Sequence, residues 1–345
     1  MATITSLPTE ILYLISSYFG GRDHDKRNTL KRLRLVSRVF HHSASSHLFR
    51  DFSMRLYPNG RVHSRALSEL CRTGYSYCIR SLIIGMQYCE CAATRERTEP
   101  MGDSLEMCFR RMPALRRLCC YAIRCDHCQN NGIEVVRSVV NALLCSPPHL
   151  LEALYLFRID NATLDLFSGE GHPVMASILA RLRYLKIRPE DRCRLNRGQV
   201  DSLLRYGENL RSVELMFFCQ TFATSEINLH PKAPLQRLVL RGLQISSRSL
   251  SLLVETYRDT LRYIKLRGII LFGQDSHWEE PAREFRRCPL LSFFVATECH
   301  PMVDGEARYV PVNRHAHHLQ ITTGRRRMFM SPRECRLYFS DPFAG

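Results

Sequence analysis

One hydrophobic pattern recurs along most of the chain. Two residues separate a first apolar residue from a second, and one residue separates the second from a third. We call each copy a string and number its positions from the first apolar residue. The strings begin at Ile79, Leu115, Leu151, Leu182, Leu210, Leu235, Leu261 and Leu290. Short apolar runs of this kind are typical of buried β-strands.

Helix-like patterns lie between several strings, at residues 133–144, 198–206 and 249–257. Strand, loop and helix therefore alternate, which predicts parallel strands with helices on the outside. The later strings are spaced close to the leucine-rich-repeat range, and loops lengthen the earlier intervals. A non-repetitive α/β domain, whose strands also contain short apolar runs, is the alternative.

Side chains alternate along a strand, so string positions 4 and 6 should point inward. Positions 3 and 5, and the residue just after the string at position 7, should face the concave sheet. In the last string this rule places Ser292, Phe294 and Ala296 on that surface. Glu214 is the one acidic residue predicted there, among several arginines, lysines and tyrosines. Arginine beside tyrosine is common in binding hot spots, and guanidinium groups suit carboxylate or phosphate. The candidate target contacts are Tyr155, Phe157, Tyr184, Lys186, Arg188, Arg237, Arg241, Tyr263, Lys265 and Arg267.

The first fifty residues carry a different, helical pattern. Residues 6–18 have apolar residues at helical spacing, and Gly20 and Gly21 should end that helix. In the next segment Leu30, Leu33 and Val36 share one face, and Ser37 should start a third helix. Three such helices form only a small core, and a module of this size often leaves an apolar face for a partner.

The motif in this region, LPTEI followed by LRLVSRVF and LFRDF, resembles the F-box. The resemblance covers Leu7 to about Phe52, and the match departs where the family often has Trp at Phe40 and Phe49. The resemblance implies that this motif inserts into the Skp adaptor of a cullin–RING ubiquitin ligase. The matching positions taken as adaptor contacts are Leu7, Pro8, Glu10, Ile11, Leu12, Ile15, Leu33, Leu35, Val36, Ser37 and Phe40. Most strings lack the Asn that usually closes a leucine-rich repeat, so the repeats resemble the degenerate ones of fungal-type F-box proteins.

The expected fold is thus an all-α three-helix F-box at residues 1–53, followed by an α/β leucine-rich-repeat-like solenoid at residues 54–300. In the solenoid, parallel strands should line the concave face and helices the outside. Residues 301–345 lose the string and should form a basic tail or cap.

The formal net charge is +16, which favours acidic or phosphorylated partners. Nucleic acid is not the expected partner, because no nucleic-acid motif is present. No apolar run is long enough to cross a membrane, and no signal peptide is expected, because Glu10 interrupts the first apolar stretch. The expected location is cytoplasmic or nuclear, where thiols stay reduced.

A catalytic motif is not found, whether for nucleotide binding, zinc proteolysis or serine hydrolysis. No cofactor is expected, and a hidden cysteine-based ligase or protease is the enzymatic alternative. Two cysteine pairs, Cys89 with Cys91 and Cys125 with Cys128, follow successive strings, and the first cysteine of each pair lies at the same offset from its string. These thiols could meet at one edge, although unpaired loop thiols are the simpler interpretation and no metal is assigned.

The sequence therefore predicts a non-catalytic substrate receptor of a ubiquitin ligase, with an acidic or phosphorylated protein as its target. A repeat scaffold outside any ligase, binding acidic ligands or nucleic acid, is the alternative from another functional class.

Overall fold

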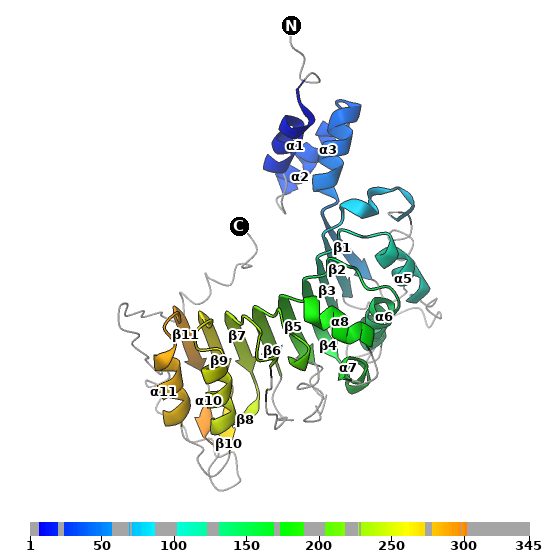
Figure 1. The fold of residues 1–345 in the computed structure, drawn as a ribbon. Helices are drawn as coiled ribbons and strands as arrows, with labels where there is room; N and C mark the ends of the chain where they lie inside the picture. Colours follow the sequence, from blue (N-terminus) through cyan, green and yellow to red (C-terminus); the bar gives the residue numbers. More distant parts are fainter. Residues whose placement is uncertain are drawn as a thin grey trace.

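The computed structural model describes residues 7–19, 24–56, 69, 71–86, 102–122, 131–168, 173–189, 204–217, 227, 229–272, 278–297 and 299–301. An amino-terminal group of helices leads into a long parallel sheet with helices packed on it, in a solenoid-like arrangement (Figure 1). No helix in these ranges is long and apolar enough to cross a membrane.

Helices α1 (Thr9–Tyr18), α2 (His24–Leu33) and α3 (Arg38–Leu48) form the amino-terminal module. Ser37 starts α3 as predicted, because its hydroxyl accepts the backbone N–H of Phe40 at 3.2 Å. The core shared by α2 and α3 is small and consists of buried Leu30, Ala44 and Leu48. The buried Ser16 and Ser43 hydroxyls, 3.1 Å apart, link α1 to α3.

The main sheet contains nine strands, all parallel and in sequence order apart from the short strands that belong to a second sheet. The eight predicted strings each give a strand. These strands are β2 (Ser81–Met86), β3 (Arg117–Ala122), β4 (Ala153–Ile159), β5 (Tyr184–Pro189), β6 (Ser212–Met216), β7 (Arg237–Arg241), β9 (Tyr263–Arg267) and β11 (Phe293–Thr297).

Helices cover one face of this sheet (Figure 1). They are α5 (Gly102–Arg110), α6 (Asn131–Cys145), α7 (Asn161–Ser168), α8 (Pro173–Arg181), α10 (Ser247–Thr256) and α11 (Glu279–Arg287), and a short 3-10 helix, η2 (Tyr75–Cys78), precedes β2. String positions 4 and 6 point under the helices, as Leu185 and Ile187 do in β5, and both are buried. Positions 3, 5 and 7 of β5, β6 and β9 are partly exposed on the other side, which we call the open face.

The first strand, β1 (Asp51–Leu56), was not predicted. It pairs with β2, so residues 51–53, assigned from sequence to the amino-terminal module, lie in the sheet. A ninth string in fact begins at Phe49, with Phe52 and Met54 as its other apolar residues. Phe49 packs against both the small helical core and the main core.

The orientation predicted for the last strand was wrong by one residue. Phe293 lies beside Tyr263, and Phe294 lies beside the buried Ile264. The open face therefore carries Phe293, Val295 and Thr297, while Phe294 and Ala296 pack against the main core. The string therefore begins at the buried Leu291 and not at Leu290. A shift of one residue along a strand exchanges its two faces, which explains why the whole strand was assigned the wrong way round.

A second, three-stranded sheet contains β8 (Gln244–Ser246), β10 (Ile270–Phe272) and β12 (His300–Pro301). Gly242 and Gly268 turn the chain from β7 into β8 and from β9 into β10, and both have positive φ angles, of 64° and 60°. A side chain at Gly242 would meet the Phe217 carbonyl oxygen at 2.3 Å, whereas the nearest atom to one at Gly268 is 3.8 Å away.

These two glycines predict unequal costs for the same substitution. Gly268→Ala should lower the free energy of unfolding by about 1 kcal/mol, because only the left-handed backbone is strained. Gly242→Ala should cost about 3 kcal/mol, because the backbone of Phe217 must also move. Urea unfolding followed by circular dichroism measures both values, and equal losses would contradict the close packing at Gly242.

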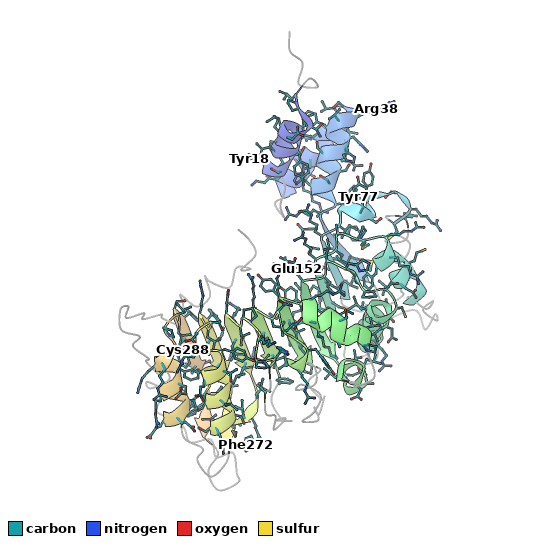
Figure 2. The ribbon with its side chains drawn as sticks, in the orientation of Figure 1. Tyr18, Arg38, Tyr77, Glu152, Phe272 and Cys288 are labelled. Carbon is teal, nitrogen blue, oxygen red and sulfur yellow. The ribbon has the colours of Figure 1, made fainter. Side chains whose placement is uncertain are left out.

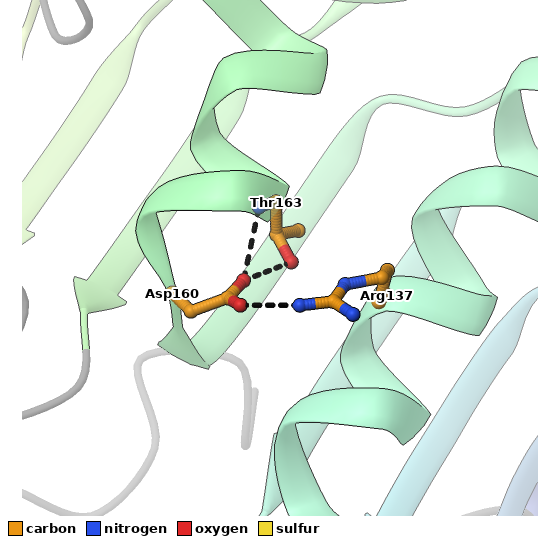
Figure 3. Close-up of polar contacts among 3 residues, drawn as sticks. All are labelled: Arg137, Asp160 and Thr163. Carbon is orange, nitrogen blue, oxygen red and sulfur yellow. Dashed lines mark hydrogen bonds and ion pairs between the residues drawn. The ribbon is translucent and has the colours of Figure 1, made fainter.

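Asp160 directly follows β4 and links two helices, α6 and α7 (Figure 3). Its carboxylate accepts the Thr163 backbone N–H at 2.9 Å at the start of α7, and also the Thr163 hydroxyl. Its other oxygen lies 2.6 Å from the Arg137 guanidinium on α6. Burial raises the pKa of Asp160, but the hydrogen bonds from Thr163 and the charge of Arg137 outweigh it and leave the pKa below its ordinary value.

Asp160→Ala should lower the free energy of unfolding by about 2 kcal/mol at neutral pH, through loss of a helix cap and a charged hydrogen bond. A depressed carboxyl pKa stabilises the fold above the unfolded-state pKa of about 4 and ceases to do so as the pH falls through the folded-state value. The difference between the two proteins should therefore shrink in acid. Asp160→Asn should lose less, because Asn still caps α7, and a constant difference at all pH values would contradict the assignment.

Candidate protein-interaction surfaces

Helix α1 and the residues just before it carry a stripe of exposed apolar side chains. Leu7, Ile11, Leu14 and Tyr18 follow one another at helical spacing, and the last two are 65% and 75% exposed. Leu12 and Ser16, on the opposite side, are fully buried. An amphipathic helix usually buries its apolar side, but α1 exposes a second apolar stripe.

A second exposed apolar group lies in the turn between α2 and α3 and in the first turn of α3. It consists of Leu35, which is 87% exposed, together with Val36 and Val39. Backbone hydrogen bonds from Leu35 and Val36 to the end of α2 hold this turn in place. Together with the α1 stripe, it forms what we call the apolar groups of the module. Large exposed apolar groups of this kind commonly mark docking sites.

The predicted adaptor contacts divide into three sets. Leu7, Pro8, Glu10, Ile11, Leu35 and Val36 are exposed, and Ile15, Leu33 and Ser37 are partly buried. Leu12 and Phe40 are buried inside the module, at 0% and 1% exposure, so their side chains cannot form a docking surface and that part of the prediction is corrected. Leu14, Tyr18 and Val39 were missed, although the spacing of Leu14 and Tyr18 from Ile11 indicated the stripe.

Aromatic and charged side chains join the module to the first repeats. The Arg34 guanidinium lies 5.2 Å from the Phe49 ring centre and 5.5 Å from that of Tyr75, and these two rings stack at 4.9 Å. His41 lies within hydrogen-bonding distance of both Arg34 and the Tyr75 hydroxyl, at 3.2 Å in each case. The module is therefore packed onto the sheet and not merely tethered to it.

On the open face, the ten predicted target contacts are brought together by the strand register. Tyr155 lies beside Lys186, and Lys186 beside Glu214. The Lys186 amine forms a 2.7 Å ion pair with Glu214 and lies 5.5 Å from the Phe157 ring centre. Much of the Lys186 charge is thus compensated within the sheet, which the sequence alone did not reveal.

Flat side chains stack across the last strands of this face. The Arg237 guanidinium lies 4.1 Å from the Tyr263 ring centre, and Tyr263 stacks on Phe293 at 4.3 Å with the rings nearly parallel. Arg241 and Arg267 occupy neighbouring positions on the same strands, further along. Phe293 was assigned to the other face from sequence, yet it completes this stack. The remaining predicted contacts, Tyr184, Arg188 and Lys265, are partly exposed on the same face.

The proposed thiol cluster of Cys89, Cys91, Cys125 and Cys128 lies outside the described residues. Within them, no group of three or more His, Cys, Asp or Glu side chains could hold a metal ion. The cysteines that the structure describes are not joined in disulfides.

No protein-family model matches the sequence, and no curated protein matches it either.

The burial difference between Phe40 and Val36 gives a direct test of the module. Phe40→Ala should destabilise the three helices by about 3–5 kcal/mol, because a buried aromatic ring is lost. Val36→Ala, at a 60% exposed position, should change stability by less than about 0.5 kcal/mol. Hydrogen exchange of α1–α3 measures both effects, and a mild Phe40→Ala variant would place that ring at the surface.

Proposed function

We propose that this protein is the substrate-recognition subunit of a Skp–cullin–F-box ubiquitin ligase. The observation that carries the proposal is the exposure of Leu7, Ile11, Leu35 and Val36 within a motif that resembles the F-box. A module with so small a core gains stability when a partner covers such groups. The solenoid that follows offers a separate surface for a target.

In this proposal the chain performs no chemistry itself. The apolar groups of the module bind the Skp adaptor, and the adaptor connects the chain to a cullin–RING ligase. The solenoid holds a target protein near the recruited ubiquitin-conjugating enzyme. Binding raises the effective concentration of target lysines at the transferring thioester, and that proximity is the whole contribution of the chain.

The open face from β4 to β11 is the proposed target site. Its arginines and lysines outnumber the single Glu214, which favours an acidic or phosphorylated protein. The stack of Arg237, Tyr263 and Phe293 offers a flat, pre-ordered platform. Lys186 is a weaker candidate than the sequence suggested, because Glu214 already neutralises it.

A repeat scaffold outside any ligase is the second candidate function. The basic open face favours it, because that surface could bind an acidic ligand or nucleic acid without an adaptor. The two candidates differ in what the amino-terminal module does, and adaptor binding therefore separates them.

Ile11→Asp combined with Val36→Asp should abolish capture of the Skp adaptor, because two charges replace exposed apolar contacts. Both residues are exposed, so the module should stay folded. Leu252→Asp, on the exposed surface of α10 at 57% exposure, is the matched control and should bind the adaptor normally. Co-purification of each variant with the adaptor, alongside circular dichroism, measures the effect.

Adaptor capture by the double variant at the level of the unaltered protein would refute the docking role of these groups. Failure of the unaltered protein to bind any Skp adaptor would refute the ligase proposal and favour the scaffold.

A further inference from the structure

One row of residues runs along the edge where the strands of the main sheet begin. These residues occupy string position 2, directly before each strand. In eight consecutive steps, the backbone carbonyl of one row residue accepts the N–H groups of positions 2 and 3 in the next repeat, at 2.7–3.1 Å. The row consists of Arg50, Arg80, Arg116, Glu152, Arg183, Arg211, Gln236, Arg262 and Ser292.

Arginine dominates this row far beyond its share of the chain. Lysine and arginine make up 49 of the 345 residues, about one in seven, but six of the nine row positions are arginine. All six are exposed. We call these six residues, Arg50, Arg80, Arg116, Arg183, Arg211 and Arg262, the arginine row.

Glu152 is the only acidic residue in the row. Its carboxylate lies 3.3 Å from Arg116 and 4.0 Å from Arg183. Arg50, Arg80, Arg211 and Arg262 have no acidic partner among the residues that the structure describes. Neighbouring strands are about 4.8 Å apart, so Arg183 and Arg211 repel each other across one step. A bound anion would relieve that repulsion.

The row is distinct from the open face. Its residues precede the strands, whereas the open face carries positions 3, 5 and 7 within them. Figure 2 labels Glu152 at the edge of the sheet on the side of the amino-terminal helices. The first member, Arg50, follows α3 by two residues, so the row starts at the module and runs away from it along the solenoid.

We propose that the arginine row binds an extended acidic protein segment. Guanidinium forks at regular intervals suit carboxylates, which they can bind through two hydrogen bonds each. Seven steps of about 4.8 Å from Arg50 to Arg262 span roughly 34 Å, or about ten residues of extended chain. A nucleic-acid backbone carries a phosphate at every nucleotide and would bring phosphates against Glu152. A peptide can instead have an uncharged residue at that point. The proposal does not depend on the ligase function.

The test uses the full chain and a fluorescein-labelled peptide of about ten residues that alternates Glu and Ser. A row variant, with Arg183→Gln, Arg211→Gln and Arg262→Gln, copies the residue already present at Gln236. It should weaken peptide binding, measured by fluorescence anisotropy at low ionic strength, by about tenfold or more, because three exposed ion pairs are lost. Glu152→Gln should tighten binding, because it removes the single opposing charge.

Two controls carry matched charge changes. Arg248→Gln, Arg283→Gln and Arg286→Gln remove three exposed arginines from α10 and α11 and should weaken binding less than about twofold. An open-face variant replaces Arg188, Arg241 and Arg267 with Gln and tests whether the peptide binds there instead. Single-stranded DNA of equal charge serves as the competing ligand.

Loss of peptide binding in the row variant alone, with a gain in Glu152→Gln, supports the proposal. Equal losses in the row and helix variants would mean that net charge alone attracts the peptide, and a loss confined to the open-face variant would place the site on that face. Tighter binding of DNA than of peptide, lost in the row variant, would identify nucleic acid as the partner. Each of these three outcomes overturns the proposal.

Discussion

The double hydrogen bond at each string position 2 is the contact on which the rest of the structure depends. One carbonyl accepts two backbone N–H groups from the next repeat, and the same pairing occurs at every step from Arg50 to Ser292. This pairing fixes the register before each strand begins. Because a shift of one residue would turn the buried apolar positions outward, the register also decides which side chains form the open face. Apolar burial under the helices then stabilises the arrangement that the hydrogen bonds specify.

Phe49 extends this regularity into the amino-terminal module. It follows the last residue of α3, and it also occupies position 1 of the first string, so one side chain contributes to both cores. Only two residues separate α3 from β1, and Arg34 and Tyr75 pack on the Phe49 ring. The direction of the module relative to the sheet is therefore set by packing. In a receptor of the proposed kind, that rigidity would hold a bound target at a constant distance from a docked adaptor.

The sequence predicted the repeated strands well, because a string leaves an apolar signal wherever a strand is buried on one side. The prediction failed where the same residues fitted two different patterns. Phe49 to Met54 was read as the end of a helical motif, which hid a ninth string. At Leu290 and Leu291, two adjacent leucines allow two registers, and only pairing with β9 chooses between them. Leu12 could not be assigned to the core from periodicity, because α1 is apolar on two sides. The Lys186–Glu214 ion pair joins residues of different strands, so it could be recognised only once the strand register was known.

The arginine row was visible in principle, since most strings begin with an apolar residue followed by arginine. A search for apolar periodicity ignores that position.

The open face and the arginine row use positive charge in different ways. On the open face, Lys186 is paired with Glu214 and Arg237 lies on Tyr263, so much of the charge is engaged before any ligand arrives. A ligand there would be selected mainly by shape and by flat contacts, because the side chains are already ordered. Along the edge, Arg211 and Arg262 are exposed and without acidic partners among the described residues. Charges of that kind act at a distance of about 10 Å, so they speed encounter as well as adding to affinity. A chain with both surfaces can attract an acidic protein along the edge and then discriminate among such proteins on the face, which a uniformly basic surface could not do.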